Sequence, residues 1–163
     1  MKKQKGFSLI ELLIVVAIIL IIAAIAIPNL MRSKMAANES SAVGSLRTIN
    51  TAMVTYSTTF PTVGYAATLA PLGNGATTTP CTGSQAAQST AACLIDSVLA
   101  SGTKSGYTFT ATGGGQTPAV TYTSSATPQA PNQSGTRYFC SDQSGVIYAN
   151  STTACTTANG TPL

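Results

Sequence analysis

Polar residues are nearly missing from the stretch Phe7–Ile27. Of its 21 residues, only Ser8 and Glu11 are polar. As an α-helix the stretch has a length of about 31 Å, close to the roughly 30 Å hydrocarbon core of a bilayer. Lysines precede it and fewer cations follow it directly, which by the positive-inside rule places the N-terminus in the cytoplasm. The pattern therefore predicts one membrane-spanning helix, with everything after Pro28 outside.

Beyond Pro28 the apolar residues recur with the period of an α-helix. They follow one another at spacings of 4, 3, 4, 3 and 4 residues, at Ala42, Leu46, Ile49, Met53, Tyr56 and Phe60. Pro61 ends the helix, because a proline disfavours helical geometry in the residue before it. We expect the apolar face to pack under a sheet. The other positions, with the charged residues Arg32, Lys34, Glu39 and Arg47, are expected on the solvent or subunit-contact side.

After Pro61 the pattern changes to short runs with the period of a β-strand. "GYTFTATG" and "AVTYTS" alternate apolar and polar residues, and "TRYFCSDQSGVIYAN" is typical of two strands joined around Asp142–Gly145. "TAACLIDSVLASG" indicates a short helix that ends at Gly102. The stretches Gly73–Ser89 and Gly113–Gln133 are expected to be mostly loop, apart from "AVTYTS". The predicted fold is α+β: a long N-terminal helix packed on an antiparallel meander of about four strands.

The composition argues against an enzyme. Only 7% of the residues are charged, and the chain has four acidic residues and no histidine, so there is little material for general acid–base catalysis. We expect no catalytic residue and no cofactor. The formal charge of +4 includes three lysines ahead of the apolar stretch. Without them five cations face four acids, a net charge of +1, so the charge does not indicate a nucleic-acid partner.

The four cysteines are predicted to form disulfides. Cys81, Cys93, Cys140 and Cys155 all lie outside the membrane by the topology above, where oxidation is permitted. Their spacing includes no C-x-x-C pair and the chain has no histidine, so we expect no metal site. Three connectivities are possible. We favour Cys81 with Cys93 and Cys140 with Cys155, because each pair is nearest in sequence and closes one loop.

Two ordinary functions would account for an apolar N-terminal stretch: a secretory signal peptide and a plain membrane anchor. The residues Ala24–Ala26 fit the small-residue cleavage site of a secretory signal peptide, although the apolar run is long for such a peptide. A plain membrane anchor would also tolerate Glu11, because the side chain lies close enough to the cytoplasmic interface to reach it. This second explanation accounts for the tolerance of a carboxylate and not for its presence.

The segment "KGFSLIELLIVVAIILIIAAIAIP" resembles the N-terminus of type IV pilins and of the pseudopilins of type II secretion. The resemblance implies that a membrane-embedded prepilin peptidase cuts after Gly6 and methylates the new N-terminal residue, Phe7. It also implies an assembly role for Phe7, Glu11 and the helix-bending Pro28. A buried carboxylate is costly unless it is paired, and we expect Glu11 of one subunit to pair with the Phe7 amine of the next.

The resemblance also implies how the chain is organised and where it works. Residues 1–6 would be the cleaved leader, 7–28 the transmembrane and assembly helix, 29–60 its amphipathic continuation and 61–163 a β-rich head with disulfide loops. The subunit would wait in the inner membrane and polymerise, through the pilus assembly machinery, into a homo-oligomeric surface fibre. A disulfide near the C-terminus is similar to that of type IV pilins, which bounds a variable surface loop, here 141–154.

Three functions therefore remain open at the level of the sequence. The favoured one is a structural subunit of a type IV pilus. The second is a type II secretion pseudopilin, a class whose main type resembles a calcium-binding fold; Asp96 and Asp142 alone would make a poor site for an ion that takes about six to eight oxygen ligands. The third is a secreted binding or adhesion domain, released by ordinary signal-peptide cleavage after Ala26.

Overall fold

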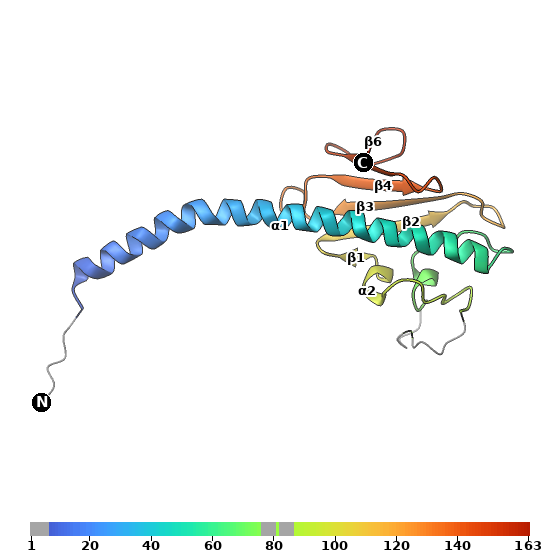
Figure 1. The fold of residues 1–163 in the computed structure, drawn as a ribbon, viewed down its shortest axis with the longest axis horizontal. Coiled ribbons are helices and arrows are strands. Elements are labelled where there is room, and N and C mark those ends of the chain that lie inside the picture. The colour runs from blue at the N-terminus through green and yellow to red at the C-terminus, as the bar shows by residue number, and fades with distance from the viewer. Residues whose placement is uncertain (1–6, 76–80, 82–86) are drawn as a thin grey trace, which may run out of the picture. The chain divides into compact units, whose positions relative to one another are not determined.

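The structure is a computed structural model that describes residues 7–75, 81 and 87–163 (Figure 1). The chain divides into two compact units, Met1–Lys34 and Met35–Leu163, and each is considered by itself. One helix, α1 (Leu9–Thr59), contributes to both units. The remaining elements all belong to the second unit. The boundaries predicted for the leader, the transmembrane helix, its continuation and the head stay predictions.

In the first unit α1 begins at Leu9, just after a residue that caps it. The carbonyl of Ser8 accepts a 3.2 Å hydrogen bond from the N–H of Leu12, while the N–H of Ser8 donates a 3.0 Å hydrogen bond to the Glu11 carboxylate. A Ser followed three residues later by Glu is a capping-box pattern. Pro28 lies inside the helix without interrupting it. Because proline has no N–H, the helix lacks one hydrogen bond there.

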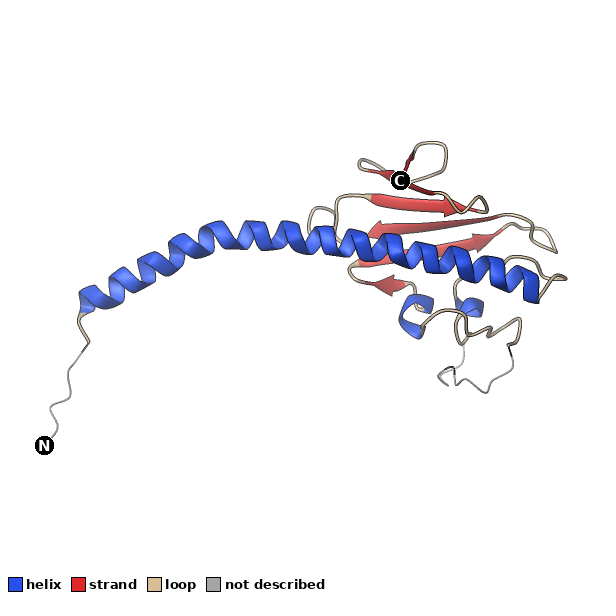
Figure 2. Cartoon of the chain, viewed as in Figure 1, coloured by secondary structure: helices blue, strands red, loops and turns tan. Residues whose placement is uncertain are grey.

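In the second unit the last part of α1 carries one fully buried apolar face. Figure 2 shows this part of the helix lying over one face of the sheet. The positions that the 3.6-residue period predicts are buried there, and Phe60 is partly buried against the same core; the fully buried ones are Ala42, Leu46, Ile49, Met53 and Tyr56. The prediction of a long helix packed on a sheet is therefore confirmed. The helix ends at Thr59, two residues before Pro61.

The sheet has six antiparallel strands among the described residues, in the order β1 to β6. The strands are β1 (Thr103–Lys104), β2 (Tyr107–Gly113), β3 (Tyr122–Pro128), β4 (Tyr138–Asp142), β5 (Ile147–Asn150) and β6 (Thr161–Pro162). Each pairs with its neighbour in sequence, so the sheet is a meander. The inward side chains of β2 and β4, Tyr107, Phe109, Ala111 and Phe139, join the helix residues in one core. The α+β class is confirmed.

The strands differ from the prediction in number and length. The run "AVTYTS" predicted a strand over residues 119–124, but β3 begins at Tyr122 and continues to Pro128, within the stretch 113–133 that we expected to be mostly loop. The end of this strand is hard to recognise in the sequence, because its buried positions after Tyr122 are Ser124, Ala126 and Pro128, none of which is a large apolar residue. Strands β1 and β6 have only two residues each. A run that short has no detectable period.

The predicted short helix over residues 90–102 is much shorter in the structure. Helix α2 contains only Ser97–Ala100, with Asp96 as its N-cap. The residues before it belong to no helix and are hydrogen-bonded to η1, a short 3₁₀ helix (Ala70–Leu72). The N–H of Leu94 donates a 2.6 Å hydrogen bond to the carbonyl of Leu72, so this backbone is satisfied without forming a helix. The predicted loop over residues 73–89 lies largely outside the described residues.

Candidate functional site

The N-terminal segment leaves a continuous apolar surface uncovered. Every Leu, Ile, Val and Phe side chain from Phe7 to Ile27 is between 46% and 79% exposed. This part of α1 is long and apolar enough to cross a membrane, judged by length and composition. Soluble proteins rarely expose contiguous apolar patches above a few hundred Å². An exposed apolar surface of this kind is typical of a segment that lipid or other protein covers.

The predicted processing and assembly residues lie around the start of α1. Gly6 falls outside the described residues. Phe7 is 79% exposed and precedes the helix. The Glu11 carboxylate, also exposed, accepts the hydrogen bond from the N–H of Ser8. Within one chain Glu11 therefore caps its own helix, a local role in addition to the one predicted for it. The predicted pairing with the Phe7 amine of another copy stays a prediction.

Glu39 lies on a different side of α1 from the one predicted from the sequence. We expected it on the solvent or subunit-contact side of the helix, but it is 7% exposed and faces the sheet. Its Oε1 accepts hydrogen bonds from the N–H of Thr136 at 2.8 Å, the Thr136 hydroxyl at 2.9 Å and the N–H of Arg137 at 3.2 Å. Its Oε2 accepts a 2.7 Å hydrogen bond from Nε of Arg137. Four donors thus compensate for the burial of one carboxylate.

The charge of Glu39 is stabilised by these donors. Burial by itself raises the pKa of this carboxyl, but the hydrogen bonds from Thr136 and Arg137, together with the positive charge of Arg137, outweigh it and leave the pKa below the usual 4.5. The Arg137 guanidinium also lies over the ring of Phe139, 5.3 Å from its centroid. Glu39 is therefore ionised at neutral pH and ties α1 to the β3–β4 connection.

A second polar contact between helix and sheet lies in the middle of the apolar face. Nδ2 of Asn50, on α1, donates a 2.8 Å hydrogen bond to the Ser141 hydroxyl on β4. Its Oδ1 accepts a 3.3 Å hydrogen bond from the Ser124 hydroxyl on β3. The Ser141 hydroxyl donates in turn to the carbonyl of Val146 at 2.8 Å. These side chains are buried, so the network holds the helix in one register on two strands.

The structure joins Cys81 to Cys93 and Cys140 to Cys155, the pairing predicted from the sequence. The first disulfide links two residues 12 apart in sequence and the second two residues 15 apart. Cys140 belongs to β4, and Cys155 precedes the turn that leads to β6. The second disulfide therefore ties the C-terminal segment to the sheet. No cysteine is left free.

The acidic side chain of Asp96 is bound at the start of α2. Asp96 forms a 3.0 Å ion pair with Lys104 and accepts a 2.8 Å hydrogen bond from the N–H of Leu99. Burial raises the pKa of Asp96, but these partners outweigh it and lower the pKa. Within the described ranges no group of three Cys, Asp or Glu side chains lies close enough together to hold a metal ion.

Comparison with known proteins finds one family match at the N-terminus and several partial relatives. Residues 1–27 match the family described as "Prokaryotic N-terminal methylation motif". The chain is 58% identical over 40 residues to a type IV wide pilus major component of Thermus thermophilus and 46% identical over 54 residues to a type IV major pilin protein of Myxococcus xanthus. It is 37% identical over 54 residues to the type II secretion system core protein G of Escherichia coli.

These similarities cover a limited part of each chain. They span 24%, 33% and 33% of this chain, and 30%, 24% and 37% of the respective relatives. The first two relatives are components of pili and the third belongs to a secretion system, so the likeness itself favours neither class. No solved structure matches the chain.

Proposed function

We propose that this chain is a structural subunit of a type IV pilus. Its residues 1–27 match the prokaryotic N-terminal methylation motif, and part of it is similar to two type IV pilus proteins and to a type II secretion protein. A prepilin peptidase cleaves the chain after Gly6 and methylates Phe7. It then waits in the inner membrane as a single-pass protein with a cytoplasmic N-terminus. The pilus machinery finally assembles copies of it into a surface fibre. Its work is structural and not enzymatic.

The exposed apolar surface of residues 7–27 carries the proposal. A helix that is apolar all round is stable in two surroundings, the hydrocarbon of a bilayer and the interior of a bundle of similar helices. The same residues can therefore hold the subunit in the membrane before assembly and adhere to other copies afterwards. A soluble head with one such helix needs no change of fold between the two states, because the helix meets apolar groups in both.

Glu11 then serves a purpose beyond capping. Processing after Gly6 creates a positively charged amine at Phe7, one residue before the N–H that Glu11 binds in the uncleaved chain. In a dry bundle of helices the carboxylate needs a charged partner. We propose that the Phe7 amine of the neighbouring copy supplies it and fixes the axial register of the fibre.

A type II secretion pseudopilin is the second candidate, because the chain also resembles core protein G of Escherichia coli. Such a protein shares the processed N-terminus and builds a fibre for protein export. The two candidates differ in what a deletion removes: surface filaments for a pilin, and secretion of exported proteins for a pseudopilin. Imaging of deletion cells together with an assay of secreted protein separates them.

The experiment that tests the proposal changes Glu11. In Glu11→Ala both the cap and the charge are lost, whereas Glu11→Gln keeps an acceptor for the N–H of Ser8 and loses only the charge. Cells are sheared, and fibre and membrane fractions are compared by immunoblot. We expect both variants to be processed and inserted, with sheared fibre reduced at least about tenfold. Leu12→Ala, next along the same helix, is the control for a general loss of apolar surface.

N-terminal sequencing of the sheared fraction completes the test. A methylated phenylalanine, Phe7, as the first residue is the expected result. A mature chain that starts at Ile27 would support the secreted binding domain instead and exclude both members of the pilin family. Fibre at wild-type levels in both Glu11 variants would show that the carboxylate has no role in assembly.

A further inference from the structure

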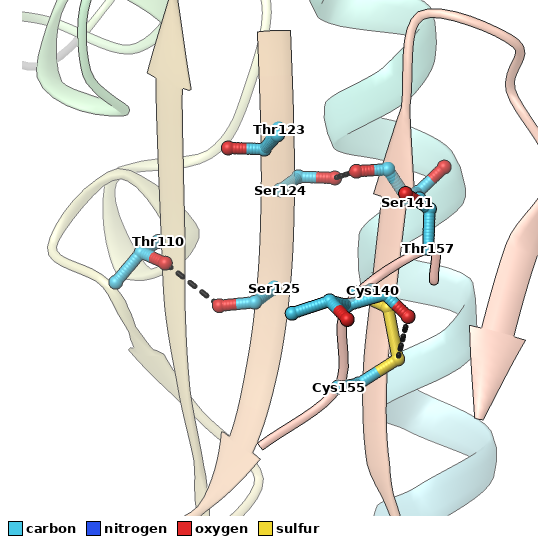
Figure 3. A pocket seen from close by; sticks show the side chains of 9 residues that line it. Thr110, Thr123, Ser124, Ser125, Cys140, Ser141, Cys155 and Thr157 are labelled. Atoms are coloured by element: carbon cyan, nitrogen blue, oxygen red, sulfur yellow. Dashed lines mark hydrogen bonds between the residues drawn. A yellow bond between two sulfur atoms is a disulfide. The ribbon is translucent and has the colours of Figure 1, made fainter. Parts of the chain in front are cut away.

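A small hollow lies on the face of the sheet that points away from α1. It has a volume of about 260 Å³ and is lined by Thr110, Thr123, Ser124, Ser125, Cys140, Ser141, Cys155, Thr156 and Thr157. Figure 3 shows Thr110, Thr123 and Ser125 on one side and the disulfide with Thr157 on the other. None of the residues that line it is charged or aromatic. The processing and assembly residues belong to the other unit, so the hollow is distinct from them.

The alternation of the strands explains why hydroxyl groups face this hollow. Ser124 points toward α1, where its hydroxyl bonds to Asn50. Successive residues of a strand face opposite sides of the sheet, so Thr123 and Ser125 face away from the helix. Thr110 lies directly opposite Ser125 on the neighbouring strand, and their hydroxyls are 2.8 Å apart. Thr110, Thr123 and Ser125 therefore lie together on the face of the sheet that points away from the helix.

The side of the hollow opposite the strands is formed by Cys155, Thr156 and Thr157. Bonds within the chain hold this segment in place without a ligand. The Cys140–Cys155 disulfide attaches it to β4. The N–H of Thr156 donates a 2.7 Å hydrogen bond to Asn159, and the N–H of Gly160 donates a 2.9 Å hydrogen bond to the carbonyl of Thr156. A wall that is already ordered loses little conformational entropy on binding.

Several hydroxyls of the hollow have hydrogen-bonding capacity left over. In the described part of the chain, the hydroxyls of Thr123, Thr156 and Thr157 take part in no hydrogen bond, and all three residues are exposed. The Thr110–Ser125 pair satisfies one donor and one acceptor between them. Each hydroxyl can donate one hydrogen bond and accept two. The hollow can therefore exchange hydrogen bonds in both directions with a ligand.

We propose that this hollow is a binding site for a neutral sugar ring. Without a cation in the lining an anionic ligand has no counter-charge, and without a carboxylate a metal ion has no suitable ligands. A sugar ring offers hydroxyls that both donate and accept, together with C–H groups that can lie on the threonine methyls and the disulfide. The volume is below the roughly 300 to 1,000 Å³ of sites for drug-sized ligands, which suits a single ring.

The test is ligand-detected NMR of the full chain in a zwitterionic detergent, which avoids detergents with sugar headgroups. The probes are glucose, galactose, mannose and N-acetylglucosamine, with glucuronate as the charged counterpart. We expect at least one neutral sugar to bind with a dissociation constant of about 1 mM and glucuronate to bind more weakly. Thr123→Val and Thr157→Val each remove one hydroxyl at constant shape and should weaken binding about three- to tenfold.

Two further variants make the result decisive. Ser125→Phe places a bulky ring in the hollow from the outer face of β3 and should abolish binding. Thr108→Val removes a hydroxyl from the same face of β2 outside the hollow and should leave binding unchanged. Absence of binding by every neutral sugar up to about 50 mM, equal binding of glucuronate, or an equal loss in Thr108→Val and Thr123→Val would overturn the proposal.

Discussion

Nε of Arg137 lies 2.7 Å from Oε2 of Glu39, and this contact joins α1 to a segment 98 residues further along the chain. The carboxylate is buried, whereas the Arg137 side chain is 45% exposed. The carboxylate of the pair is therefore buried between helix and sheet, whereas the guanidinium remains in contact with water. Because Thr136 also donates two hydrogen bonds to the same carboxylate, the contact fixes the start of β4 relative to the helix.

Replacing Glu39 by alanine should destabilise the head domain by about 3 kcal/mol, at the lower end of what the loss of one partner of a buried pair costs. The exposed Arg137 stays solvated, which keeps the loss from being larger. Thermal and denaturant unfolding of the detergent-solubilised chain, followed by circular dichroism, measures the change. Lys104→Met is the matched control, because it breaks an exposed ion pair worth less than about 1 kcal/mol. Equal effects of the two variants would contradict the assignment.

Glu39 should also make the stability depend on acidic pH. The pKa of its carboxyl is lower in the folded chain than the usual 4.5, so the unfolded chain binds the proton first as the pH falls. The contribution is therefore fully present above pH 4.5 and is lost as the pH falls through the folded pKa. Unfolding free energies measured from neutral pH downwards should decrease less steeply in Glu39→Gln than in the wild type. Parallel curves below pH 4.5 would contradict the sign.

The pattern of apolar residues predicted the fold well where the pattern was long. The helix face from Ala42 to Phe60 and the strand beginning at Tyr107 each repeat over enough positions to identify their period. The extension of β3 to Pro128 was missed, because Ser124 is polar yet buried and so breaks the expected alternation. Helix α2 was predicted too long, because the N–H of Leu94 bonds to the carbonyl of Leu72 in η1 and not to a carbonyl of its own segment.

Asn50 should contribute more to the free energy of unfolding than an exposed polar residue does. Asn50→Ala leaves the hydroxyls of Ser124 and Ser141 buried with fewer partners and should cost about 2 kcal/mol of unfolding free energy. Because the residues share one network, the losses in Asn50→Ala and Ser124→Ala should differ from additivity by at least about 0.5 kcal/mol in the double variant. Thr51→Ala, the exposed neighbour, should change stability by less than about 0.5 kcal/mol. Strict additivity would show that the residues act separately.

The polar contacts between helix and sheet were the part that the sequence could not predict. Glu39 and Asn50 have the residue types of a solvated face, and their partners lie 97 and 91 residues away. No local period reveals that such positions turn inward. One signal was available for Glu39: it precedes Ala42 by three positions and Leu46 by seven, which places it on the apolar face.

Alkaline conditions should weaken the fold through Tyr122. Burial, with smaller effects from Tyr65 and Asp142, raises the pKa of this phenol from the usual 10 to about 12. A raised folded pKa means that the stabilisation is complete below pH 10 and is lost as the pH rises toward 12. Unfolding free energies measured between these values should fall more steeply in the wild type than in Tyr122→Phe. Identical slopes would mean that the phenol ionises as readily in the folded chain as in the unfolded one.

The Cys140–Cys155 disulfide should hold the C-terminal segment in place more than it holds the sheet together. It closes a loop of 15 residues, for which the chain-entropy model gives about 3 kcal/mol. Strand β6 pairs with β5 through only two residues, so it depends on this link. In the double variant Cys140→Ala/Cys155→Ala, hydrogen exchange should quicken at Thr161 and Leu163 while the amides of β2 and β3 stay protected, and membrane insertion should not change. The variant Cys81→Ala/Cys93→Ala is the matched control and should leave exchange at Thr161 as it is. Unaltered exchange at Thr161 and Leu163 after loss of Cys140 and Cys155 would show that β6 is held by its own hydrogen bonds.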